Sequence, residues 1–135
     1  MNKRGHYGGF VAAAAVSFIV TKDPIFSISG AWLGSFIPDV DNKKSHINSQ
    51  IYLFRSIYKP IQKIAFKNGI TYNIFKHRGA LTHSWLTIAI IATLYKYYDN
   101  SFLFGVLIGV FIHHILDMFT YQGLRYFYPL KTKLF

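Results

Sequence analysis

A histidine and an aspartate share one face of a strongly apolar segment near the end of the chain. His113 and Asp117 are four residues apart, so on a helix their side chains are neighbours. An imidazole and a carboxylate at this spacing can bind one cation, and ionisable side chains in apolar helices are costly and usually functional. A hydrogen-bonded pair in a buried core explains the spacing equally well, so the pattern alone leaves both interpretations open.

Further ionisable residues border the other apolar segments. His6 precedes the first segment, Asp39 and Asp41 end the second, and His83 begins the third. Taken singly, the two aspartates suit a turn that ends a helix, and His6 suits the protein surface. Together with the pair above, they make six candidate ligands of the imidazole and carboxylate type, which suits zinc, manganese or iron. Six exceeds the usual four ligands of one zinc ion and allows two metals, as in many phosphoester hydrolases.

Four apolar segments predict the helices that carry these residues. They cover residues 7–21, 25–38, 81–98 and 102–121, and each exceeds ordinary strand length. We therefore expect an all-α fold, a compact bundle of four apolar, membrane-embedded helices in a single domain spanning 1–135. At 15 and 14 residues, the first two segments are shorter than the roughly 20 residues that cross a bilayer. Gly-x-x-x-Gly pairs at 30/34 and 105/109 favour close helix packing.

The positive charges divide unevenly among the connections between these segments. Thirteen of the 15 Lys and Arg residues fall before the first segment, between the second and third, or after the fourth. The positive-inside rule then predicts a multi-pass protein with both termini and the long connection in the cytoplasm. All six candidate ligands fall at that same end. Lys3 and Arg4 before an apolar segment also fit a signal peptide, although a second apolar segment follows at once.

The long connection contains a basic amphipathic helix, at about residues 45–69. Apolar residues recur there at three- and four-residue steps, and four cations form a stripe at i,i+4 spacing: Arg55, Lys59, Lys63 and Lys67. Such a helix suits an anionic lipid surface, and a solvated helix that covers the end of the bundle is the alternative. The net charge of +10 also fits nucleic acid, but no binding motif favours that partner.

Three strings in this chain resemble one known family. They are FIPDVD at 36–41, HRGALTHS at 77–84, and HxxxDxxT at 113–120 followed by Gly123 and Pro129. With the early His6, they resemble the bacterial and phage family of LexA-regulated, inner-membrane, metal-dependent hydrolases. The order of histidines and aspartates is also similar, more loosely, to zinc-dependent phospholipase C and P1-type nuclease folds. The resemblance covers nearly the whole chain and implies an all-α hydrolase of the bacterial inner membrane.

The resemblance also implies roles for individual residues. One or two divalent ions, with zinc first and manganese or iron as alternatives, would be bound by His6, Asp39, Asp41, His83, His113 and Asp117. Arg78 would grip a phosphate, although a cation facing lipid is an alternative role, and His77 would bind metal or donate a proton. The ligands would be oriented by three hydroxyl side chains: Thr82, Ser84 and Thr120. His114 is expected to point about 100° away from His113 and to lie outside the site.

Three functions compete on this evidence. The first is metal-dependent hydrolysis of a phosphoester, either a small molecule or a lipid head group. The second is a non-catalytic membrane protein with a structural metal or polar cluster and a basic helix that binds lipid or a partner. The third, transport, is disfavoured because residues 12–20 and 86–94 are nearly free of ionisable groups. The excess of candidate ligands favours hydrolysis over the second.

Overall fold

The residues that the structure describes form helices joined by short turns. A computed structural model describes residues 3–41, 56, 60, 63–64 and 82–119. These ranges contain four α-helices and one 3-10 helix: α1 (Lys3–Thr21), α2 (Pro24–Phe36), η1 (Ile37–Asp41), α6 (Trp85–Tyr98) and α7 (Ser101–Met118). The all-α prediction is confirmed for this part of the chain. The second apolar segment was predicted as one helix to residue 38, but it changes to 3-10 geometry after Phe36.

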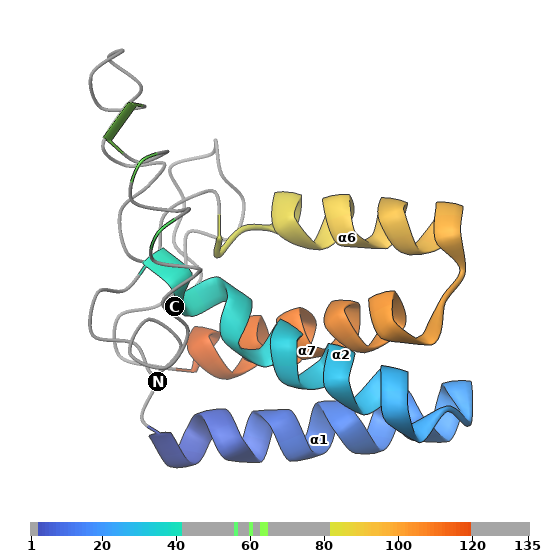
Figure 1. The fold of residues 1–135 in the computed structure, drawn as a ribbon. Helices are drawn as coiled ribbons and strands as arrows, with labels where there is room; N and C mark the ends of the chain where they lie inside the picture. The colour runs from blue at the N-terminus through green and yellow to red at the C-terminus, as the bar shows by residue number, and fades with distance from the viewer. Residues whose placement is uncertain (1–2, 42–55, 57–59, 61–62, 65–81, 120–135) are drawn as a thin grey trace.

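Two tight turns make the helices antiparallel in pairs. Lys22 and Asp99 adopt positive φ values of 58° and 40°, which reverse the chain within a few residues. Asp23 then caps α2 by accepting a hydrogen bond from the Phe26 amide, and Asn100 caps α7 in the same way. The start of α1, the end of α2, the start of α6 and the end of α7 therefore meet at one end of the bundle (Figure 1), which we call the site end. We call the opposite end, with the two turns, the turn end.

Helices α2 and α7 cross with their backbones in contact, as the Gly-x-x-x-Gly pairs indicated. A Cβ atom added to Gly109 would lie 2.6 Å from the Ala31 carbonyl oxygen and 2.8 Å from the Ser35 amide nitrogen. A Cβ atom on Gly34 would likewise clash with the backbone of Val106. This contact fixes the end of α2, and with it η1, against the last two turns of α7.

Helix α6 is attached more loosely than the other three. Among the described residues it packs chiefly against α7, and Ile91 is its one buried residue. Ile91 joins Val106 and Val110 of α7 in a small apolar core. Whatever holds the start of α6 in place therefore matters for any site residue that precedes this helix.

The prediction of four membrane-spanning helices is not confirmed. Among the described helices, α7 alone, with 18 residues, is long and apolar enough to cross a membrane, and Gly5–Thr21 is a shorter apolar stretch. The 13 residues of α2 and the 14 of α6 give lengths of about 20 Å, against a hydrocarbon layer of about 30 Å. The other helices still carry exposed apolar side chains, among them Val11 on α1, Ile25 on α2 and Ile90 on α6.

The predicted basic helix falls almost entirely outside the described residues. Lys63 is described, and it is helical and exposed. The other three cations of the stripe, Arg55, Lys59 and Lys67, lie outside the description. Binding of this segment to lipid stays a prediction.

Candidate metal centre

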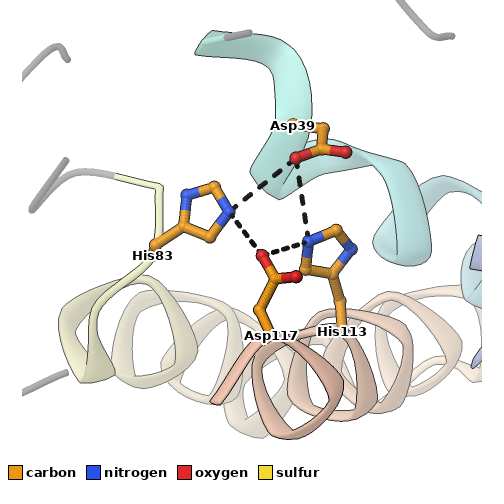
Figure 2. Close-up of side chains that lie close together, drawn as sticks. All are labelled: Asp39, His83, His113 and Asp117. Atoms are coloured by element: carbon orange, nitrogen blue, oxygen red, sulfur yellow. Dashed lines mark ion pairs between the residues drawn. The ribbon is translucent and has the colours of Figure 1, made fainter. Parts of the chain in front are cut away.

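Four side chains from three parts of the chain converge at the site end. Asp39 comes from η1, His83 from the turn before α6, and His113 and Asp117 from the last turns of α7 (Figure 2). Each offers one ligand atom, and the four atoms all lie within 4.8 Å of one another. All four residues are buried; His83 and Asp117 are 0% exposed. The fold thus places two imidazoles and two carboxylates around one point.

The distances within this cluster suit a cation between the side chains better than direct ion pairs. His113 Nε2 lies 3.4 Å from Asp117 Oδ2, and His83 Nε2 lies 3.5 Å from the same oxygen. Both Nε2 atoms lie 3.9 Å from Asp39 Oδ1. A charge-assisted hydrogen bond would bring such atoms to about 2.7–2.9 Å. Tetrahedral ligands about 2.0–2.2 Å from a zinc ion lie roughly 3.3–3.6 Å apart, close to the two shorter distances.

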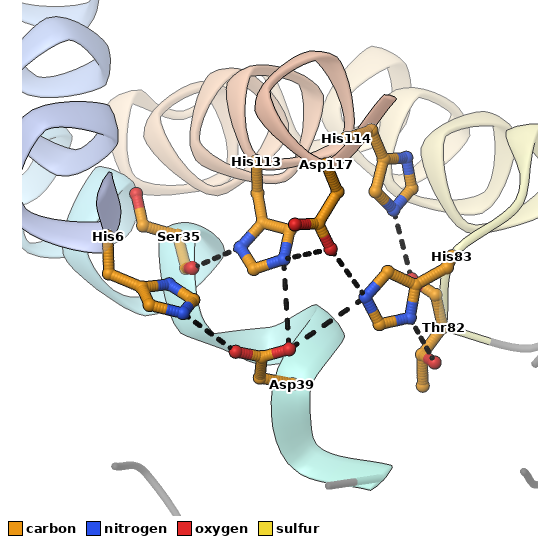
Figure 3. A network of polar contacts seen from close by, with 8 residues as sticks. All are labelled: His6, Ser35, Asp39, Thr82, His83, His113, His114 and Asp117. Carbon is orange, nitrogen blue, oxygen red and sulfur yellow. Dashed lines mark hydrogen bonds and ion pairs between the residues drawn. The ribbon is translucent and has the colours of Figure 1, made fainter. Parts of the chain in front are cut away.

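Hydrogen bonds on the far side of each imidazole orient its Nε2 atom toward the cluster. His113 Nδ1 donates to the Ser35 carbonyl oxygen at 2.7 Å (Figure 3). A carbonyl oxygen can only accept, so in the neutral ring Nε2 carries the lone pair. His83 Nδ1 lies 3.0 Å from the Thr82 hydroxyl oxygen, which gives His83 the same tautomer when the hydroxyl accepts. Metal-binding histidines typically donate their other ring N–H in this way.

His6 lies beside the cluster and contacts Asp39 rather than the converging atoms. Its Nε2 lies 2.9 Å from Asp39 Oδ2, while the other oxygen, Oδ1, faces the two histidines of the cluster (Figure 3). The His6 ring stacks on Phe36, with centroids 5.7 Å apart and an interplanar angle of 17°. In the structure His6 is a hydrogen-bond partner of a candidate ligand, and the prediction that it binds metal itself stays a prediction.

The surroundings of Asp39 favour its charged form. Burial raises the pKa of its carboxyl group, but the hydrogen bond from His6 and the attraction of His113, His6 and His83 in their protonated forms outweigh burial. The pKa of Asp39 therefore lies below its ordinary value of 3.8. An ionised carboxylate at neutral pH is the form that binds a metal.

His114 also lies at the site end, outside the four-residue cluster as expected, but it contacts the segment that carries His83. It is 1% exposed, and its Nε2 donates a hydrogen bond of 3.0 Å to the Thr82 carbonyl oxygen. Its ring stacks on His83, with centroids 5.8 Å apart and an interplanar angle of 27°. The 100° step from His113 does turn it away from the converging atoms, but toward the segment that carries His83. His114 therefore ties α7 to the start of α6.

The remaining predicted residues divide into described and undescribed ones. Thr82 is buried and touches His83 Nδ1, as expected of an orienting residue, and Ser84 is buried at the N-cap position of α6. The description does not extend to His77, Arg78, Thr120 or the Asp41 side chain.

Two contributors were missed from sequence: His114 and the Ser35 carbonyl. The sequence cannot show which backbone carbonyl will contact a ligand. It does show a second histidine inside an apolar helix, and that unusual residue could have indicated the role of His114.

Comparisons with known proteins support the inner-membrane part of the resemblance drawn from the three strings. The model of the family described as YdjM inner membrane protein matches residues 1–135. The chain is 28% identical to the inner membrane protein YdjM of Escherichia coli strain K12, over 98% of this chain and 68% of that protein. It is 26% identical to the uncharacterized protein YvsG of Bacillus subtilis strain 168, over 90% of this chain and 69% of that protein. No solved structure matches this chain. A family match along the whole length shows that the chain belongs to the YdjM inner membrane protein family.

Proposed function

We propose that this protein is a metal-dependent phosphoester hydrolase of the bacterial inner membrane. The observation that carries the proposal is the cluster of Asp39, His83, His113 and Asp117, in which the Nδ1 atoms of both histidines are engaged by oxygens outside the cluster. Two carboxylates and two neutral imidazoles form a donor set that balances a divalent ion and suits zinc, with manganese or iron as alternatives. The relatives' names support the membrane location.

Each described residue has a definable task in this proposal. A bound divalent ion would supply Lewis acidity and lower the pKa of a water molecule. Asp39 and Asp117 provide the negative charge that holds the ion, and Ser35 and Thr82 keep the imidazoles turned inward. His6 holds the outer oxygen of Asp39, which directs the other oxygen to the centre. His77 and Arg78 remain candidates for proton donation and phosphate binding.

A structural metal site is the second candidate, and one observation favours it. All four candidate ligands are protein side chains and all four are buried, which is typical of closed zinc sites. Hydrolysis needs one further coordination position on the metal that is open to water, as in zinc sites that gain a ligand during the reaction. A structural site and a hydrolytic site would use the same four ligands. An assay of phosphoester hydrolysis therefore distinguishes the two functions.

The topology and the partners complete the proposal. We place both termini and the connection between α2 and α6 in the cytoplasm, because thirteen of the 15 Lys and Arg residues fall there. The stripe that includes Lys63 would bind anionic lipid on that side. A reporter fused to the C-terminus tests this arrangement, and a periplasmic signal would contradict it.

Metal analysis of the detergent-purified protein tests the function, with two matched variants. Asp117→Asn removes a charge from the centre and nearly preserves the side-chain shape. Asp99→Asn makes the same change at the other end of α7, where Asp99 is exposed. We expect metal in the wild-type protein and in Asp99→Asn, a loss of at least about tenfold in affinity for Asp117→Asn, and hydrolysis of phosphoesters that follows metal content. Equal metal in both variants would refute the site, and bound metal without hydrolysis would favour the structural role.

A further inference from the structure

The two tryptophans of the chain both flank the candidate metal centre. Trp85 begins α6 directly after the segment that carries His83, and it is 44% exposed. Trp32 lies on α2 and is 43% exposed; its ring contacts Phe36, on which His6 stacks. Half-exposed tryptophans of this kind prefer the level of the lipid head groups, where the ring is partly apolar and its N–H is wet.

The turn end of the bundle has a matching aromatic level. Tyr97 and Tyr98 end α6 and are 82% and 70% exposed. Lys22 and Asp99, the polar residues of the two turns, lie at this same end. Trp and Tyr are enriched at both surfaces of a bilayer, so α6 begins and ends with residues of interfacial type.

The rise per residue of α7 gives the depth of the candidate metal centre in the bilayer, measured from the turn end. From Asn100 at the turn end, thirteen residues of α7 lead to His113 and seventeen lead to Asp117, which corresponds to about 20–25 Å. The hydrocarbon layer is about 30 Å thick. With the tyrosines at one surface of the bilayer, the ligands of the cluster lie no farther out than the ester and phosphate groups of the opposite leaflet.

The outward-facing side chains beside the cluster are apolar. Phe111 and Ile115 lie on either side of His113 along α7 and are 44% and 37% exposed. Leu86 follows Trp85 on α6 and is 40% exposed. At the level of the cluster, these described surfaces of α6 and α7 suit contact with acyl chains.

We propose that the centre takes its phosphoester from a membrane phospholipid presented at the level of Trp32 and Trp85. This inference rests on the proposed hydrolase function and specifies its substrate class. In the reaction, the oxygen of water bonds to phosphorus, one P–O ester bond breaks, and a proton from water goes to the oxygen of the released alcohol. The lipid need not leave the bilayer, because the ligands lie no farther out than its ester and phosphate groups.

The depth is measured by fluorescence quenching in vesicles of phosphatidylcholine and phosphatidylglycerol. Trp32→Phe and Trp85→Phe each leave one tryptophan, which is exposed to lipids with bromine either near the ester or near the chain end. We expect both remaining tryptophans to be quenched more strongly by bromine near the ester. Ile90→Trp in the background without both native tryptophans is the reference, because Ile90 is half-exposed in the middle of α6 and should prefer bromine near the chain end. Tryptophans that brominated lipid does not quench would place the centre in water and overturn the inference.

The substrate class is measured with one head group in two forms. Metal-loaded protein is given phosphatidylglycerol in vesicles or glycerophosphoglycerol in solution, with Asp117→Asn as the inactive control. We expect the lipid to be hydrolysed at least about tenfold faster than the soluble form. Equal rates, or a faster soluble reaction, would overturn the lipid substrate and leave the hydrolase function intact. Hydrolysis of neither would reject the hydrolase function and the lipid substrate together, whatever depth the tryptophans report.

Discussion

The two ends of the bundle use aspartate in opposite ways. At the turn end, Asp23 caps α2 through the Phe26 amide, and Asp99 sits exposed in a left-handed turn. At the site end, Asp39 and Asp117 are buried and face histidines. An exposed cap needs only local backbone geometry, whereas a buried carboxylate needs a partner for its charge. The comparison separates an end whose aspartates form turns and a helix cap from an end whose aspartates form a candidate metal site.

The largest effect on stability and metal binding should come from separating α2 and α7, whose backbones are in contact. Gly109→Ala adds a methyl group 2.6 Å from the Ala31 carbonyl oxygen, so α2 and α7 must move apart. We expect a loss of about 1–3 kcal/mol in unfolding free energy and loss of bound metal, because η1 would move away from α7. Gly8→Ala is the matched control, since nothing lies within 4 Å of its added methyl group. Thermal unfolding in detergent measures both variants, and equal melting temperatures would show that the close crossing is not needed.

A smaller effect is expected where α6 is fastened to α7. His114→Phe keeps a stacking ring next to His83 but removes the donor to the Thr82 carbonyl oxygen. The affinity for metal should fall about 10- to 100-fold, as for other residues that orient ligands. His114→Gln can restore a donor near the same position, so it should recover part of the affinity.

Titration of each His114 variant with Co²⁺ distinguishes positioning of His83 from general destabilisation. A displaced His83 should change the visible absorption of the bound cobalt, while lost stability alone would leave that spectrum unchanged. Wild-type affinity and spectrum in His114→Phe would contradict the positioning role.

The smallest effect should come from His6, which touches the outer oxygen of one ligand. His6→Phe preserves an aromatic ring over Phe36 and removes the hydrogen bond to Asp39. We expect a loss of about tenfold in metal affinity. Because the folded-state pKa of Asp39 is lowered, its ionised carboxylate stabilises the folded protein at neutral pH. This stabilisation is lost as the pH falls through that pKa. Without His6 the pKa rises, so metal release on acidification should begin at a higher pH than in the wild-type protein; complete loss of metal at neutral pH would instead identify His6 as a direct ligand.

Sequence reasoning recovered the parts of this site that depend on periodicity and charge. The four-residue step from His113 to Asp117 is a property of any helix, and alternating helix direction brought Asp39 and His83 to the same end. The turn before Pro24 was also visible as a short polar link between apolar segments. These features are local, so composition and spacing are enough to predict them.

The parts that sequence reasoning missed depend on how helices dock. Whether His114 faces lipid or protein depends on which side of α7 receives α6, and spacing within α7 does not contain that information. The role of the Ser35 carbonyl arises because α2 passes close enough to α7 for a backbone oxygen to reach His113. The assignment of His6 as a ligand followed the family resemblance, and only the packing of α1 shows that Asp39 is its partner.

The central claim is that Asp39, His83, His113 and Asp117 bind one metal ion. X-ray absorption at the metal edge of the purified wild-type protein tests it most directly, because the spectrum reports the type, number and distance of the ligand atoms. We predict nitrogen and oxygen neighbours at about 2.0–2.2 Å with the outer-shell signature of two imidazole rings, and one imidazole fewer in His83→Ala. A spectrum with oxygen neighbours alone, unchanged in His83→Ala, would contradict the claim.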